Sequence, residues 1–158
     1  MNKPWIALLA IGLWCMHAAA QPQPTIELAD AWVRALPPSQ TTTAAYLTVV
    51  NRGETAVTIV GASSELADKM EIHTTREIDG YMRMEQLPKL TVAVGQSVQL
   101  APGGTHLMLL GLAHMPVPGE NVGLCLQLEP GGEVCTTADV RKTAAGKPGH
   151  DNHQHHQK

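Results

Sequence analysis

The sequence predicts an all-β domain, an antiparallel sandwich or barrel of short strands. Three observations support this fold class. Short runs rich in Val, Ile, Leu and Thr recur at regular spacing, turn sequences separate them, and no segment has a convincing helical period. The separating sequences are LPPSQ, NRGE, IDG, APGG and EPGG, in which Pro, Gly, Asn and Asp favour turns.

Alternation of apolar and polar residues sets the expected strands in chain order. They cover residues 26–35, 44–51, 56–62, 69–74, 81–87, 96–101 and 105–112, followed by two strands on either side of Pro130-Gly131-Gly132. Residues 63–69 (SSELADK) are expected to form at most a turn or two of helix. No residue is Phe, so Val, Leu, Ile and Ala must fill most of the core, together with Trp32, Tyr46 and Tyr81.

The two ends of the chain differ in composition from its centre. Lys3, the apolar run WIALLAIGLW and the small residues HAAA predict an export signal at residues 1–20, too short to span a bilayer. Cys15 offers a lipoprotein alternative, but bulky Leu13 and Trp14 precede it where a lipobox has small residues. Residues 21–140 are then one domain, and residues 141–158, with almost nothing to bury, a flexible tail.

Charge and hydropathy exclude two classes of partner. The formal net charge is −3, and no basic stripe is present, which argues against nucleic acid. Beyond the signal, no segment is long and apolar enough to cross a membrane. The sequence therefore predicts a periplasmic protein without a membrane span in its mature form.

Cys125 and Cys135 are the only cysteines after the signal, and they flank a predicted hairpin turn. Opposed residues of an antiparallel pair lie within disulfide reach, and an oxidising compartment favours closure. A redox or metal-binding pair is the alternative. The spacing of nine intervening residues fits no CxxC-type motif, so a structural disulfide is the preferred interpretation.

Histidine and methionine share one face of the predicted strand in GGTHLMLLGL, residues 103–112. His106 and Met108 are two residues apart and point to one side, whereas Leu107 and Leu109 point to the other. After the signal, every methionine lies between Met70 and Met115.

A second pair follows if Asp79-Gly80 forms a two-residue hairpin turn. Residues whose numbers sum to 159 then face each other, which makes His73 and Met84 diagonal neighbours on one face. Met82 shares that face, and Met70 points the other way as a packing residue.

Two imidazoles and two thioethers form a selective donor set. Thioethers are soft and uncharged, so they suit Cu(I) and hold Zn(II), Mg(II) or Ca(II) poorly. The alternative is that His73 and His106 are semi-buried histidines and the methionines fill core gaps. All four residues occupy same-face positions on two hairpins, which favours the metal site, with Met82 as a spare ligand. His114 and Met115 are expected to be loop residues at its mouth.

The spacing His73, ten residues, Met84, twenty-one residues, His106, one residue, Met108 resembles the copper-ligand motif of the periplasmic copper chaperone family PCuAC. The segments DAWVRALPP, AAYLTVVNRG, MEIHTT, DGYMRMEQL and PGGTHLMLLGL resemble that family too. The resemblance implies a cupredoxin-like Greek-key β-sandwich that is not an enzyme and that binds Cu(I) through these four residues. It also implies delivery to the dinuclear copper centre of cytochrome c oxidase subunit II, often with a thiol-based copper protein.

Two features depart from the family pattern, the cysteine pair and a tail that has histidines but no methionine. The tail places His150, His153, His155 and His156 within GHDNHQHHQK. Imidazoles suit Cu(II) and Zn(II), so a flexible metal collector is expected, with a solubilising tail or purification remnant as the alternative.

Other functions remain to be weighed against a copper chaperone. A periplasmic copper scavenger or buffer would have the same ligands. A blue copper protein needs a cysteine thiolate beside two histidines, and Cys125 has an expected disulfide partner instead. A copper enzyme is disfavoured because no set of nucleophile, base and oxyanion donors is recognisable.

Overall fold

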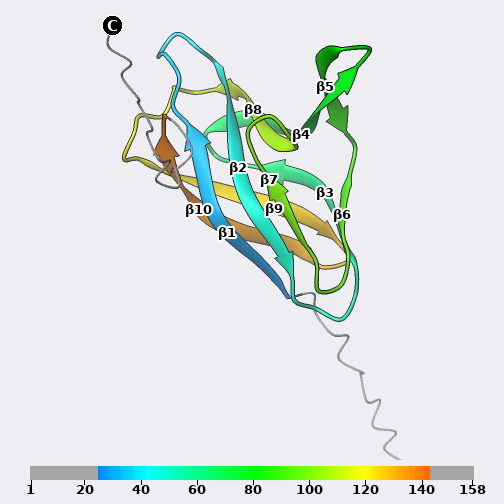
Figure 1. Cartoon of the computed structure of the whole chain (residues 1–158). Coiled ribbons are helices and arrows are strands. Elements are labelled where there is room, and N and C mark those ends of the chain that lie inside the picture. Colours follow the sequence, from blue (N-terminus) through cyan, green and yellow to red (C-terminus); the bar gives the residue numbers. More distant parts are fainter. Residues whose placement is uncertain (1–24, 143–158) are drawn as a thin grey trace, which may run out of the picture.

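The computed structural model describes residues 25–142, and these residues form one ten-stranded sheet without a helix (Figure 1). The predicted all-β class is confirmed. The predicted signal at 1–20 and the tail from 143 onward, with its four histidines, lie outside the described residues. The domain boundaries therefore stay predictions.

The strands are given in chain order with their bounds. They are β1 (Ile26–Arg34), β2 (Thr42–Asn51), β3 (Val57–Ser63), β4 (Ala67–Ile78), β5 (Tyr81–Leu87), β6 (Leu90–Val92), β7 (Ser97–Leu100), β8 (His106–Leu112), β9 (Asn121–Glu129) and β10 (Gly132–Arg141).

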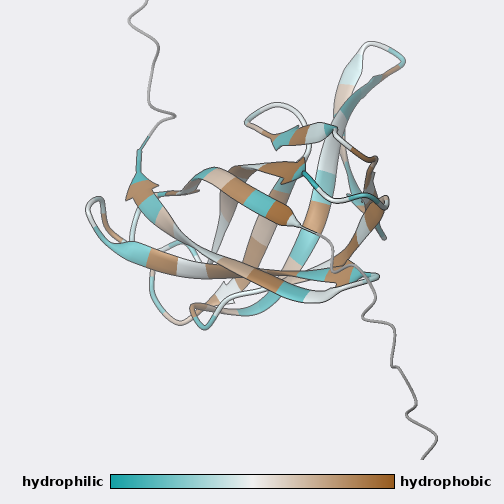
Figure 2. Cartoon of the chain, turned by 90° about the horizontal axis from the view of Figure 1, so that it is seen from below, coloured by the Kyte–Doolittle hydropathy of each residue, from teal (hydrophilic) through white to brown (hydrophobic). Residues whose placement is uncertain are grey.

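The sheet order is β5-β4-β8-β2-β1-β10-β9-β3-β6, with β7 paired to the second half of β2. Every pair is antiparallel except β1 with β10, which run parallel. The sheet folds over on itself, so that β3 comes close to β4 and β6 to β2. The result is a β-sandwich, and Figure 2 shows hydrophobic and hydrophilic residues alternating along its strands.

The core lies between the two layers and contains aliphatic side chains from both. Ile59, Leu107, Leu109, Leu124 and Leu126 are among its largest fully buried members. Strand β8 shows the alternation that the sequence predicted. Leu107 and Leu109 enter this core, which leaves the other face of β8 for His106 and Met108.

The predicted helical patch at 63–69 is wrong. Ser63 ends β3 and Ala67 already begins β4, because the backbone of Ala67 and Lys69 pairs with β8. A short isolated helical turn forms few hydrogen bonds, whereas this segment gains a full ladder to a neighbouring strand. The structure also adds β6, which the sequence did not indicate, and extends β4 to Ile78.

The turn between β4 and β5 has the predicted two-residue form. Asp79 and Gly80 both have positive φ, 54° and 79°, as a type I′ hairpin turn requires. Ile78 faces Tyr81, and the register continues without a shift to Ile72 opposite Leu87. In Figure 1 this hairpin, drawn in green, projects from the body of the sandwich.

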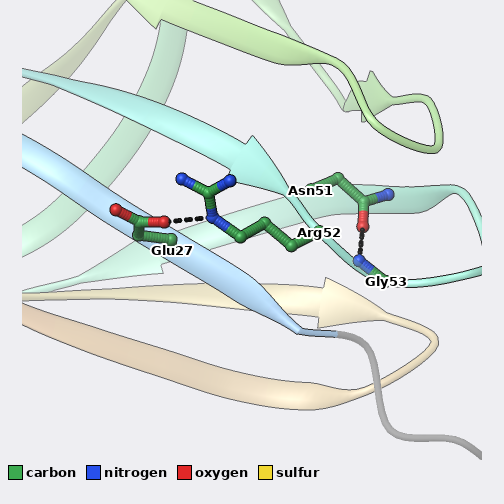
Figure 3. Close-up of polar contacts among 4 residues, drawn as sticks. All are labelled: Glu27, Asn51, Arg52 and Gly53. Carbon is green, nitrogen blue, oxygen red and sulfur yellow. Dashed lines mark hydrogen bonds and ion pairs between the residues drawn. The ribbon is translucent and has the colours of Figure 1, made fainter.

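The end of β2 is held by a buried amide. The Asn51 side chain donates to the carbonyl oxygens of Thr55 (2.8 Å) and Val92 (3.1 Å), and its oxygen accepts from the Gly53 backbone N–H at 3.0 Å. Figure 3 shows the last contact beside the ion pair of Arg52 with Glu27 on β1. These bonds replace the ladder where β2 stops, so the turn into β3 is fixed by the sequence NRGE.

The two cysteines face each other across β9 and β10. Cys125 and Cys135 are direct register partners with Cα atoms 4.0 Å apart, and their sulfurs are joined. Glu133 lies close to both sulfurs, but a sulfur pair bonded to itself offers no thiolate to a metal. The geometry agrees with the predicted disulfide between neighbouring strands.

We expect loss of this crosslink to lower stability without changing the fold. Closing a loop with a sequence separation of 10 restricts the unfolded chain, which corresponds to about 2–3 kcal/mol. The measurement is urea unfolding of a double Cys125→Ser, Cys135→Ser variant against the parent, with thiol counting on the unreduced parent. Free thiols in that sample, or an unchanged free energy of unfolding, would contradict a structural role.

Candidate metal centre

The centre of the candidate site is the pair of histidines on adjacent strands. His73 on β4 and His106 on β8 are direct cross-strand partners, and their ring centroids lie 6.1 Å apart. This pairing depends on the register of β4 with β8, which also places Ile72 opposite Leu107 in the core. Burial of the apolar partners therefore fixes the position of the imidazoles on the other face.

The two methionines occupy neighbouring positions of the same face. Met108 faces Glu71 across the β4–β8 ladder, and Met84 faces Thr75 across the β4–β5 ladder. Each methionine is therefore a diagonal neighbour of His73, one toward each end of β4. The predicted placement of all four residues on one face is what the structure shows; their role as ligands stays a prediction.

Exposure rises steeply across this group of residues. His106 is 5% exposed, the His73 side chain 18%, and Met84 55%, because Met84 lies on the projecting hairpin. Met82 shares the face of Met84 and is also exposed. Met70 is buried in the core on the opposite face, as the sequence predicted for a packing residue. The site thus has a mostly buried part, formed by the histidines, and an exposed part, the β4–β5 hairpin with Met84.

The two histidines are held by different hydrogen bonds. His106 Nδ1 donates to the carbonyl oxygen of Gly104 at 2.9 Å, so its Nε2 keeps a free lone pair. His73 uses the other nitrogen, with Nε2 2.7 Å from Glu71 Oε2. Its Nδ1 is buried and has no hydrogen-bond partner among the described residues.

Glu71 connects His73 to a lysine. Its Oε1 lies 2.6 Å from Lys69 Nζ, and its side chain is only 13% exposed. The hydrogen bond from Lys69, followed by that from His73, holds the pKa of Glu71 below its ordinary value of 4.5, against the opposing effect of desolvation. The carboxylate is therefore ionised at neutral pH and accepts from both neighbours. Sequence reasoning missed Glu71, although its spacing of two from His73 placed it on the same face.

An aromatic row continues from His106 across the same face. Tyr46 on β2 lies 6.2 Å from His106 and 4.4 Å from Trp32 on β1, measured between ring centroids. The guanidinium of Arg34 lies over Tyr46 and that of Arg141 over Trp32, at 5.4 and 5.8 Å. Burial raises the pKa of Tyr46, and Arg34 partly offsets this effect. His106, at the end of this row, is buried.

Three aromatic residues were expected in the core. The structure buries Trp32 and Tyr46 and corrects the expectation for Tyr81. Tyr81 is 71% exposed at the start of β5, next to the hairpin turn. Trp32 and Tyr46 are buried, but outside the main apolar cluster and on the face of the histidines. The alternation of side chains along β2 assigns Tyr46 to one face of its strand. Matching that face to the face of His106 requires the pairing of β2 with β8.

The expectation for His114 and Met115 at the mouth of the site is also wrong. Met115 is buried in the core. His114 lines a separate cleft of about 770 Å³ with Glu65 and Glu120, and none of the four predicted ligands borders that cleft. The chain folds inward after β8, so these two positions leave the face that carries His106.

Comparison with known proteins places this chain in a family. Residues 26–140 match the family model described as "Putative lipoprotein LpqE-like". The chain belongs to the LpqE-like family. One relative, "Putative lipoprotein Lxx21020" of Leifsonia xyli subsp. xyli, is 31% identical over 107 residues, which cover 67% of this chain and 63% of that protein. The match thus spans less than two thirds of that relative.

Solved structures of PCuAC domains share the fold of this LpqE-like chain. The Cu(I) form of DR1885 from Deinococcus radiodurans is 35% identical, with a TM-score of 0.60, over 81% of this chain and 85% of that one. The copper-bound PCuAC domain of PmoF2 is 25% identical with a TM-score of 0.62, over 80% and 98%. The metal-free PCuAC domain of PmoF1, at 22% identity and a TM-score of 0.61 over 73% and 92%, shows the fold alone. The resemblance to PCuAC proteins is confirmed.

We expect Glu71 to make the stability of the metal-free protein depend on acid. A carboxyl with a lowered pKa stabilises the fold above its ordinary pKa of 4.5 and loses that contribution as the pH falls through the folded-state pKa. Thermal melts from about pH 6 down to about pH 3 should therefore fall less steeply for Glu71→Gln than for the parent. Glu85→Gln, on the exposed face of β5, is the control and should follow the parent. Equal slopes for all three proteins would contradict the contacts drawn for Glu71.

Proposed function

We propose that this protein is exported to the periplasm and carries Cu(I) there as cargo. The ion is bound by His73, His106, Met84 and Met108. The observation that carries the proposal is the direct pairing of His73 with His106 on a face that also holds both methionines. The PCuAC structures support it, because two that share the fold are copper-bound. Soft, uncharged thioethers favour Cu(I) over the harder ions of the periplasm.

The residues fit copper because each nitrogen has a defined role before metal arrives. His106 offers Nε2, since Nδ1 donates to Gly104. His73 has one buried nitrogen without a partner, an arrangement that a metal ion would satisfy. Within residues 25–142, neither histidine hydrogen-bonds a hydroxyl or thiol that could act as a nucleophile, so the arrangement supports binding rather than catalysis.

The exposed β4–β5 hairpin suits a carrier that must release its cargo. Met84 and Met108 lie on opposite sides of His73 along β4, so a bend of the β4–β5 hairpin over the histidines would bring both thioethers toward one ion. Beyond His73 the hairpin is paired with no other described strand, and Thr75 donates one backbone hydrogen bond to Gly104, so bending it there breaks few contacts. Withdrawal of Met84 would leave copper with fewer donors and open to an acceptor.

The proposed recipient is the dinuclear copper centre of cytochrome c oxidase subunit II, with a thiol-based copper protein as a further partner. Export agrees with the lipoprotein names of the family and of the Leifsonia relative. Among residues 25–142, no helix is long and apolar enough to cross a membrane. We place the protein in the periplasm, exported by its N-terminal signal.

The deciding experiment is copper transfer. Cu(I)-loaded protein is mixed with the metal-free soluble domain of an oxidase subunit II, and copper in each partner is measured after separation. Delivery predicts that the acceptor fills faster than from a small-molecule Cu(I) buffer of equal free copper. If copper stays on the chain while the acceptor remains empty, the alternative of a periplasmic scavenger or buffer is favoured.

We expect two methionines to behave in opposite ways when replaced. Met108→Ile removes the sulfur but keeps an apolar side chain, so Cu(I) affinity should fall by more than about tenfold, the lower limit for residues that merely support a metal ligand. Met70→Ala should instead lower the free energy of unfolding by about 2–5 kcal/mol through loss of core packing. Cu(I) competition titrations and urea melts on both variants test this. A larger copper defect in Met70→Ala would exclude the proposed ligand set.

We also expect the tail and the folded domain to prefer different copper ions. Truncation after Arg141 removes His150, His153, His155 and His156, which as imidazoles suit Cu(II). Cu(I) affinity should stay nearly unchanged, and most Cu(II) binding should be lost. Parallel titrations of both ions against full-length and truncated protein measure the split. Equal losses of Cu(I) and Cu(II) would assign the tail to the primary site.

A further inference from the structure

The two proposed histidine ligands present opposite nitrogens to their protein partners. His106 donates from Nδ1 to a backbone carbonyl, and His73 makes its contact from Nε2 to a carboxylate. Metal-bound histidines usually donate the other ring N–H to such an acceptor, which fixes the tautomer. The same rule applied to both rings gives different metal-binding atoms.

We infer that Glu71 is a positioning residue that holds His73 as the Nε2–H tautomer, so that His73 binds copper through Nδ1 and His106 through Nε2. This inference rests on the proposed function. It adds a residue outside the four ligands and assigns the ligating atom of each imidazole.

The chemistry of Glu71 decides the tautomer of His73. An ionised carboxylate only accepts hydrogen bonds, so Nε2, 2.7 Å from Oε2, must carry the proton. In a neutral ring the lone pair is then on Nδ1. This atom is buried and unpaired within residues 25–142, and leaving a buried polar atom without a partner has a free-energy cost. A copper ion on Nδ1 would remove that cost without breaking the bond to Glu71.

Lys69 completes the arrangement on the same strand. Residues 69, 71 and 73 point to one face of β4, and Lys69 Nζ lies 2.6 Å from the second carboxylate oxygen. Glu71 thus has one oxygen on Lys69 and one on His73, which restricts its rotation. It also faces Met108 across the β4–β8 ladder, so it lies beside a second proposed ligand.

In the competing arrangement, His73 binds copper through Nε2 instead of Nδ1. Nε2 could bind the ion if Glu71 swung away on loading, and the contact with Glu71 would then only fill the site of the metal-free protein. The two arrangements differ in which nitrogen carries the proton after metal is added. That difference can be measured directly.

The first measurement uses metal-free, ¹⁵N-labelled full-length protein at neutral pH. Long-range ¹H–¹⁵N correlation of the imidazoles should show an Nε2–H tautomer for His73 and an Nδ1–H tautomer for His106. In Glu71→Gln the His73 tautomers should mix, since the amide can donate as well as accept. Glu85→Gln should leave both rings unchanged. An Nδ1–H tautomer for His73 in the parent would overturn the inference even if the protein binds copper well.

The second measurement adds one equivalent of Cu(I) under anaerobic conditions. The Nδ1 resonance of His73 and the Nε2 resonance of His106 should shift on metal binding, while the Nε2–H of His73 persists. Glu71→Gln should lower Cu(I) affinity by about 10- to 100-fold, and Lys69→Met by less. A metal shift at Nε2 of His73 would overturn the inference and leave the proposed function intact. No shift at either histidine would instead refute the proposed copper site.

Discussion

The pairing of β4 with β8 is the interaction on which the rest of the site depends. One ladder aligns Ile72 with Leu107 inside the sandwich and His73 with His106 outside it. A shift by one residue would expose the aliphatic pair and bury the imidazoles, at a cost set by the apolar surface involved. The hydrophobic core therefore determines the distance between the histidines, and no separate device is needed to bring them together.

Strand β4 also links a rigid region to a less supported one. Its first half pairs with β8 and carries Lys69, Glu71 and His73, and β5 joins it from Ile72 onward. Its second half extends past the body, where it pairs with β5 (Figure 1). Met84 and Tyr81 on β5 are exposed. A two-stranded ribbon has few buried contacts and opens at low cost. The same strand thus orders the imidazoles and leaves the thioether of Met84 free to move.

Local signals in the sequence were sufficient for the parts of the fold that depend on neighbouring residues. Asp79-Gly80 specified the hairpin and hence the register of Met84 with Thr75, and alternation in β8 separated His106 from Leu107. Features that need distant strands were missed. The parallel contact of β1 with β10 and the row from Trp32 to His106 follow from sheet order, which residue patterns do not encode. Glu71 was missed because an acidic residue on a strand has no distinctive pattern until its neighbours are placed.

The exposure of the hairpin has a chemical consequence in an oxidising compartment. Sulfur in the described part of the chain occurs in two forms, a closed cystine between β9 and β10 and the thioethers of the methionines. The cystine is already oxidised, whereas an exposed thioether such as that of Met84 can be converted to a polar sulfoxide. A sulfoxide is no longer a soft donor, and Met84 contributes nothing to the buried core. In the proposed ligand set, oxidation of Met84 would therefore weaken Cu(I) binding while the sandwich stays folded, and enzymatic reduction of the sulfoxide would restore it.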